Sequence, residues 1–294
     1  MDEHKAAGGG QPTPTDAPRP DLLKGPGAIA VLMPVWGFFG LGWACLSGLI
    51  AVALHVAIGG DLSNPVLPAG INAAATAIQL AGFAGIAAVL AFANRVPFER
   101  AFALRKPAPI LLLIGFVGGM TVGFFPGWIA EQLELLRPEW MPSTLEMIRD
   151  ALLTSSFNDK LAMTAAVTLA APLFEELLFR GWLWDLIEEN GNWVLAWVAT
   201  SVLFGMMHID PVQGTAVMFT GFFLGWLRHV SGSIWPCVAC HFMNNALASI
   251  FTMSIEVEST VSLPFWAVAL ATLFTLGLAG VGFKFRSEGD PGRD

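Results

Sequence analysis

The sequence predicts an all-α membrane protein, a polytopic bundle of about eight transmembrane helices. Of its 294 residues, 55% are hydrophobic and only 13% are charged, which is far from the composition of a soluble domain of this length. Apolar stretches of about 20 residues, the length a helix needs to cross a hydrocarbon core of roughly 30 Å, recur along the chain. Gly and Ala are frequent within these stretches and strand-type alternation is absent, so helices are favoured over a closed β-barrel.

The first 27 residues differ in composition from the rest of the chain. The glycine run Gly8 to Gly10 and five prolines occur there with few large apolar groups, so the segment cannot bury enough surface to fold. We expect residues 1–27 to form a disordered cytoplasmic tail. The first apolar run begins near Ala28 and is too long for the hydrophobic region of a secretory signal, so its helix is expected to remain in the mature protein.

Eight apolar segments follow the tail, and turn-forming residues separate them. The expected spans cover residues 28–58, 69–93, 108–135, 159–184, 193–209, 212–229, 233–251 and 261–284. Glycines at four-residue spacing occur in two of these spans and let helix backbones approach closely. They are Gly115, Gly119 and Gly123 in the third span, and Gly221 and Gly225 in the sixth.

The charged residues predict the orientation of the chain and exclude one class of partner. With the N-terminus inside the cell, eleven Lys and Arg residues, Arg228 among them, fall in inner segments. Only Arg137, Arg149 and Lys160 fall in outer ones. Both termini are therefore expected in the cytoplasm, with the chain as a multi-pass protein of the cell (plasma or inner) membrane. The net charge of -8, without clustered Lys and Arg, argues against a nucleic-acid partner.

Ionisable and amide side chains within three of the expected spans indicate a functional site. A charged group at the centre of a membrane helix costs about 2.5 to 3.5 kcal/mol on insertion scales, so its presence favours a function. The fourth, fifth and seventh spans hold Glu175, Glu176, Arg180, His208, His241, Asn244 and Asn245. We interpret these residues as parts of one site, whereas His4, His55 and His229 lack polar partners at helical spacing and are expected to be structural.

Helical spacing predicts how these side chains are arranged. Glu176 and Arg180 are four residues apart, so they share a helix face and can form an ion pair, which leaves Glu175 available. Glu175 and His208 lie at similar distances from the expected turn at residues 190–191, so an antiparallel hairpin brings them to the same depth. His241 and Asn245 are also four apart and present two hydrogen-bonding groups on one face.

In this order the residues resemble the CAAX-protease and bacteriocin-processing family of intramembrane proteases. That family carries the patterns EExxxR, FxxxH and HxxxN on successive membrane helices. Here they read Glu175-Glu176 to Arg180, Phe204 to His208, and His241 to Asn245. Each pattern alone is weak, but three in order on the expected helices form a specific signal.

The resemblance implies an intramembrane endopeptidase with residues 155–251 as its catalytic core. Residues 28–150 would form the N-terminal transmembrane helices, and residues 261–294 the last transmembrane helix and a cytoplasmic tail. Glu175 and His208 would activate water, His241 and Asn245 would stabilise the oxyanion, and Glu176, Arg180 and Phe204 would support them. Chemistry permits this, because a carboxylate can act as general base and preorganised donors stabilise a tetrahedral intermediate.

The expected partners are the lipid bilayer and a membrane protein or peptide substrate of prenylated or leader type, and no cofactor is expected. Three other functions remain open from the sequence. Zinc could bind Glu175, His208 and His241, although the HExxH pattern of many zinc proteases is absent. Cys237, Cys240 and His241 match the CxxCH spacing of haem attachment. Intramembrane carboxylates and histidines also form the proton-coupled sites of transporters.

Overall fold

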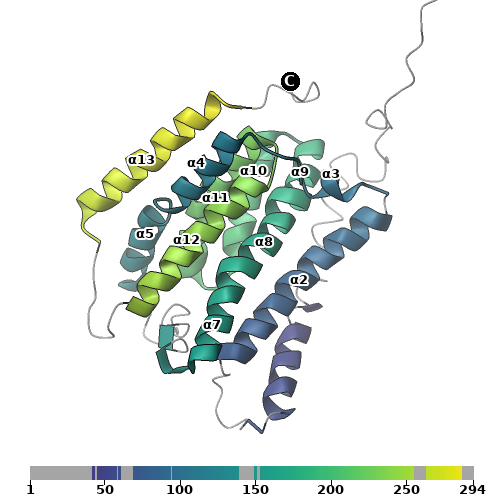
Figure 1. The fold of residues 1–294 in the computed structure, drawn as a ribbon, viewed down its shortest axis with the longest axis vertical. Coiled ribbons are helices and arrows are strands. Elements are labelled where there is room, and N and C mark those ends of the chain that lie inside the picture. Colours follow the sequence, from purple (N-terminus) through teal and green to yellow (C-terminus); the bar gives the residue numbers. More distant parts are fainter. Residues whose placement is uncertain are drawn as a thin grey trace, which may run out of the picture.

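The structure, a computed structural model, describes residues 42–43, 45–57, 59–60, 69–93, 95–138, 149–150, 153–254 and 263–286. Within these ranges every regular element is a helix, which confirms the all-α class (Figure 1). The expected tail at 1–27 lies outside the described residues, as do residues 28–41 of the first expected span.

The helices begin and end close to the borders of the predicted segments. An apolar helix, Cys45–Ala57, precedes the numbered elements. These are α2 (Ala69–Ala93), α3 (Phe98–Ala101), α4 (Pro109–Gly119), α5 (Phe124–Glu134), α7 (Phe157–Ala165), the π-helix η3 (Ala166–Ala170), α8 (Ala171–Glu176), the π-helix η4 (Leu177–Leu183), α9 (Trp184–Asn190), α10 (Trp193–Met206), α11 (Pro211–Ser231), α12 (Trp235–Ser254) and α13 (Phe265–Phe283).

Among the described residues, four helices are long and apolar enough to cross a membrane. They are Gly70–Phe92, Pro109–Glu134, Phe157–Asn190 and Phe265–Phe283. The expected number of eight spans is therefore not confirmed. The reason lies in the chain itself: α10 is short, and α11 and α12 carry polar residues that lower their mean hydropathy.

The fourth expected span is one run of helix, Phe157–Asn190, in which the π-helices η3 and η4 flank α8. Pro172 accounts for the first of them in part, because proline has no backbone N–H to donate to a carbonyl in the preceding turn. In π-helical spacing the missing donor would face the carbonyl of Val167. That carbonyl instead accepts a hydrogen bond from Nδ2 of Asn245 at 2.9 Å.

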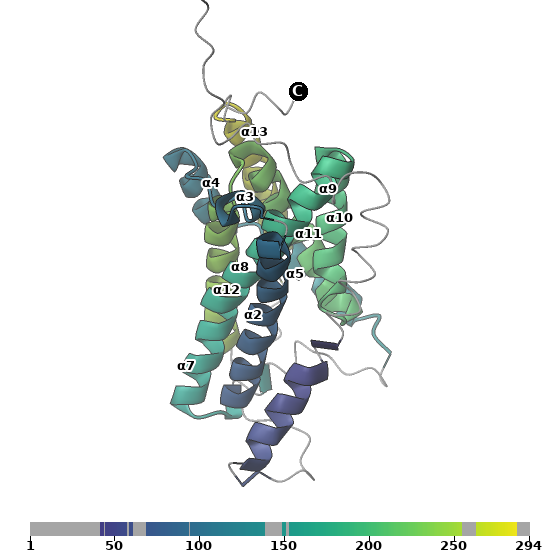
Figure 2. The same ribbon diagram turned by 90° about the vertical axis from the view of Figure 1, so that its right-hand side faces the viewer.

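The helices pack around this run. α2 lies beside α7 and α8 in both views, α10 and α11 form an antiparallel hairpin pair, and α13 lies along α4 and α5 at the edge (Figures 1 and 2). The predicted role of the glycines is confirmed between α4 and α12. A Cβ atom at Gly115 would collide with the carbonyl of Pro236, and one at Gly119 with the carbonyl of Cys240.

Candidate active site

The ion pair expected between Glu176 and Arg180 is present at the centre of the bundle. Both side chains are 0% exposed, and Arg180 Nη1 donates to Glu176 Oε1 at 3.1 Å. Arg180 Nη2 donates to the carbonyl of Gly221 at 2.9 Å, and the guanidinium lies 4.7 Å from the ring centroid of Phe204. Arg180 is therefore fixed by a carboxylate, a carbonyl and an aromatic face together.

His241 lies between the two adjacent glutamates. Its Nδ1 is 2.9 Å from Glu176 Oε1, and its Nε2 is 3.8 Å from Glu175 Oε2. The contact with Glu176 was not foreseen from the sequence, because the two residues are 65 positions apart. Glu176 thus binds Arg180 and orients the imidazole of His241, and the second ring nitrogen faces Glu175.

His208 follows the end of α10 and approaches the same site. Its Nδ1 lies 2.9 Å from the carbonyl of Phe204, four residues earlier. The Phe204 ring meets both imidazoles edge-on, with centroids 5.3 Å from His208 and 5.6 Å from His241. The Phe204 ring therefore links His208 to His241, whose Nε2 lies 3.8 Å from Glu175 Oε2.

Asn245 lies one turn beyond His241 but directs its amide to the helix backbone. Its Nδ2 donates to the carbonyl of Val167, to which Pro172 has no N–H to donate. This hydrogen bond joins α12 to η3. Asn244 donates to Asn245 Oδ1 at 3.3 Å. The Nδ2 of Asn245 has two hydrogens, and its bond to the Val167 carbonyl uses one of them, so one further donor remains.

Comparison with known proteins relates the part of the chain that carries these residues to a family of proteases. Residues 157–247 match the family described as type II CAAX prenyl endopeptidase Rce1-like. Over these residues the chain is similar to the Rce1-like family of CAAX prenyl endopeptidases. The chain is also 23% identical over 225 residues to "Putative membrane peptidase YdiL" of Bacillus subtilis (strain 168). The aligned residues cover 73% of this chain and 88% of that relative. No solved structure matches the chain.

A second buried arginine supports the site. Arg228 is 1% exposed, and its Nε donates to the carbonyl of Arg180 at 2.6 Å. Its Nη2 lies 2.6 Å from Asp185 Oδ1. Sequence analysis counted Arg228 among the charges of the inner segments, and the structure places it, buried, in the last turn of α11. The ion pair of Arg228 with Asp185 could not be predicted from spacing, because the two residues are 43 positions apart. The apolar residues around Arg228 were the one sign in the sequence that it is buried.

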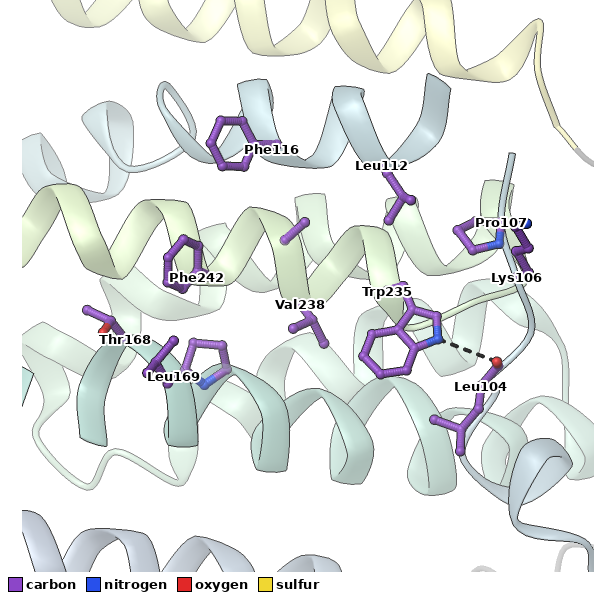
Figure 3. Close-up of a pocket in the computed structure, with 12 residues that line it drawn as sticks. Leu104, Lys106, Pro107, Leu112, Phe116, Thr168, Leu169, Trp235, Val238 and Phe242 are labelled. Atoms are coloured by element: carbon purple, nitrogen blue, oxygen red, sulfur yellow. Dashed lines mark hydrogen bonds between the residues drawn. The ribbon is translucent and has the colours of Figure 1, made fainter. Parts of the chain in front are cut away.

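An apolar groove runs along α12 between α4 and the η3–α8 segment (Figure 3). It has a volume of about 540 Å³, and Lys106 is the charged residue of its lining. Pro172 lies one turn before Glu175, and Phe242 follows His241, so the groove uses helices that also carry the site. The lining consists of Leu104, Lys106, Pro107, Leu112, Phe116, Thr168, Leu169, Pro172, Trp235, Val238, Ala239 and Phe242.

The part of the chain that the structure describes contains no group of three or more His, Cys, Asp and Glu side chains arranged to hold a metal ion. Glu175, His208 and His241 are near one another but do not form such a group. Cys237 and Cys240 are fully buried in α12, and Cys237 Sγ donates to the carbonyl of Leu224. Neither thiol is therefore placed at the surface, where a haem would have to attach.

Proposed function

We propose that the protein is an Rce1-like protease that hydrolyses a peptide bond with water that Glu175 and His208 activate. The observation that carries the proposal is the buried carboxylate of Glu175, which lies 3.8 Å from His241 Nε2, while His208 packs against the same Phe204 ring as His241. Because Arg180 neutralises Glu176, Glu175 is the carboxylate of the pair that remains to accept a proton.

The proposed reaction assigns a task to each side chain. Glu175 takes a proton from water that His208 orients, and the oxygen of that water attacks the carbonyl carbon of the scissile bond. His241, with a proton on both ring nitrogens, donates from Nδ1 to Glu176 and from Nε2 to the oxyanion of the tetrahedral intermediate, to which Asn245 donates its second N–H. Glu175 then passes its proton to the nitrogen of the leaving amine. Glu176 keeps His241 in one orientation, as the third member of a catalytic triad orients its base.

The groove supports a substrate with an apolar chain. The matched family is described by its action on prenylated CAAX ends, and an open groove of apolar side chains fits a prenylated or leader-type peptide that arrives from the bilayer. The substrate would lie with its apolar part along Val238 and Phe242, so that the adjoining peptide bond reaches Glu175.

We also propose that the chain is a multi-pass protein of the cell membrane with both termini in the cytoplasm.

The test is cleavage of a farnesylated CAAX peptide and of a leader-type peptide by the purified full-length chain in lipid nanodiscs. Reactions in H₂¹⁸O, read by mass spectrometry, should show one ¹⁸O in the new carboxylate and identify the cleaved bond. Glu175→Gln should lower the rate by about 10² to 10⁴. Glu99→Gln is the matched control, because Glu99 is exposed on α3. Near wild-type cleavage by Glu175→Gln would contradict the proposal.

A further inference from the structure

The turn that carries His208 is joined to a distant helix by an ion pair. Arg137 follows α5, and its Nη2 lies 2.9 Å from Asp210 Oδ1 and 3.1 Å from Oδ2. Its Nε lies 2.7 Å from Glu134 Oε2. The Arg137 and Asp210 side chains are 7% and 3% exposed. Hydrogen bonds to Asp210 and Glu134 raise the pKa of Arg137 above its ordinary value, so the guanidinium stays charged.

Asp210 connects this ion pair to the backbone of His208. Its Oδ1 caps α11 by accepting hydrogen bonds from the backbone N–H of Val212 at 2.8 Å and of Gln213 at 3.1 Å. The backbone N–H of Asp210 donates to the carbonyl of His208 at 2.6 Å. The side chain and the backbone of Asp210 therefore hold α11 and the tight turn that precedes it in one arrangement.

Ile209, at the centre of this turn, has a backbone conformation that it would not adopt unaided. Its φ is 63°, in the left-handed region that β-branched residues rarely enter. Ile209 is 89% exposed, so packing of its own side chain does not impose this conformation. The flanking contacts of His208 with Phe204 and of Asp210 with Arg137 must do so.

We propose that Arg137 is a positioning residue for catalysis, which acts through Asp210 to fix the turn at Ile209 and hence the imidazole of His208 beside Glu175. This inference rests on the proposed role of His208. Asp210 transmits the effect, since it contacts both the guanidinium and the His208 carbonyl. Arg137 itself touches neither the water nor the substrate in the proposed reaction.

The first experiment compares the kinetics of purified full-length variants in nanodiscs. In Arg137→Gln, kcat should fall by about 10- to 100-fold, the effect of a small displacement of a reacting group, with KM changed by less than about twofold. Arg137→Lys should be intermediate, because it keeps the charge but loses the bidentate geometry. Arg149→Gln is the control, because it makes the same change in an exposed pair, Arg149 and Asp150 at 3.8 Å.

The second experiment introduces Ile209→Gly into Arg137→Gln. Glycine enters the left-handed region without steric cost, so the turn should re-form more often and kcat should recover at least about threefold. A purely structural role for Arg137 would lower the yield of folded protein, leave kcat per folded molecule unchanged and give no rescue. That outcome overturns the inference. Wild-type kcat in both Arg137→Lys and Asp210→Asn, which weaken the Arg137–Asp210 ion pair from either side, also overturns it. Wild-type activity in His208→Ala would overturn the proposed function instead.

Discussion

Replacing Glu176 by Gln should destabilise the protein much more than replacing Glu175 by Gln. Removing one partner of a buried ion pair costs roughly 3 to 5 kcal/mol, because the other charge is left uncompensated. Glu176 and Arg180 are both 0% exposed, so this range applies to them. We expect the lower end, about 3 kcal/mol, because Gln keeps an acceptor oxygen and Arg180 keeps its bond to Gly221. Glu175 is also buried, but its nearest ionic contact is His241 at 3.8 Å, and Gln removes a desolvated charge without leaving a fixed cation unpaired, so this replacement should cost less than about 1 kcal/mol.

The assay is thermal unfolding of the full-length chain in detergent, followed by the fluorescence of its eleven Trp residues. A loss of 3 kcal/mol corresponds to a melting temperature about 6 to 12 °C lower for a protein of this size class. Glu99→Gln is again the control and should leave the melting temperature unchanged. Adding Arg180→Met should cost less in the Glu176→Gln background than in the wild type. In the wild type it leaves the Glu176 carboxylate buried without its cation, whereas in the Glu176→Gln variant no carboxylate is left there. Equal melting temperatures for the two glutamate variants, or strictly additive effects with Arg180→Met, would refute this reasoning.

Three further outcomes are expected. Replacing Cys237 and Cys240 together by Ala should leave kcat per folded molecule within about twofold of wild type, since neither thiol has a role in the proposed chemistry; loss of activity in a folded variant would favour haem or metal binding. Dialysis against a zinc chelator should leave cleavage unchanged, and activity restored only by added zinc would instead establish the metalloprotease. A reporter fused after Asp294 should be active only in the cytoplasm, so activity only outside the cell would contradict the proposed orientation.

The features that follow from short sequence separation could be predicted, and those that depend on distant contacts could not. Four-residue spacing on a helix was enough to predict the pair of Glu176 and Arg180, because the two residues stay on one face even though Arg180 lies in the π-helix η4. The hairpin between α9 and α10 followed from the turn residues between them. In contrast, the contact of Glu176 with His241 depends on how α8 and α12 pack, which no local pattern determines.

The role of Asn245 shows how a local signal and a distant one combine. Pro172 is visible in the sequence, and its missing N–H leaves a carbonyl without a helical partner. Which residue would satisfy that carbonyl could not be read from spacing, because Asn245 is 78 residues from Val167. The predicted oxyanion donor therefore also has a structural contact, its hydrogen bond to Val167.

Three arginines, Arg137, Arg180 and Arg228, identify α11 as the helix that holds the site together, although none of the three sequence patterns lies on it. Arg180 donates to the carbonyl of Gly221 in α11, and Arg228 of α11 donates back to the carbonyl of Arg180. Arg137 binds Asp210, the residue that caps the start of α11. A Cβ atom at Gly221 would lie 3.2 Å from Arg180 Nη2, so a small residue is needed there. The polar residues at the two ends of α11 thus reflect its bonds to neighbouring segments, and they contribute to its low mean hydropathy.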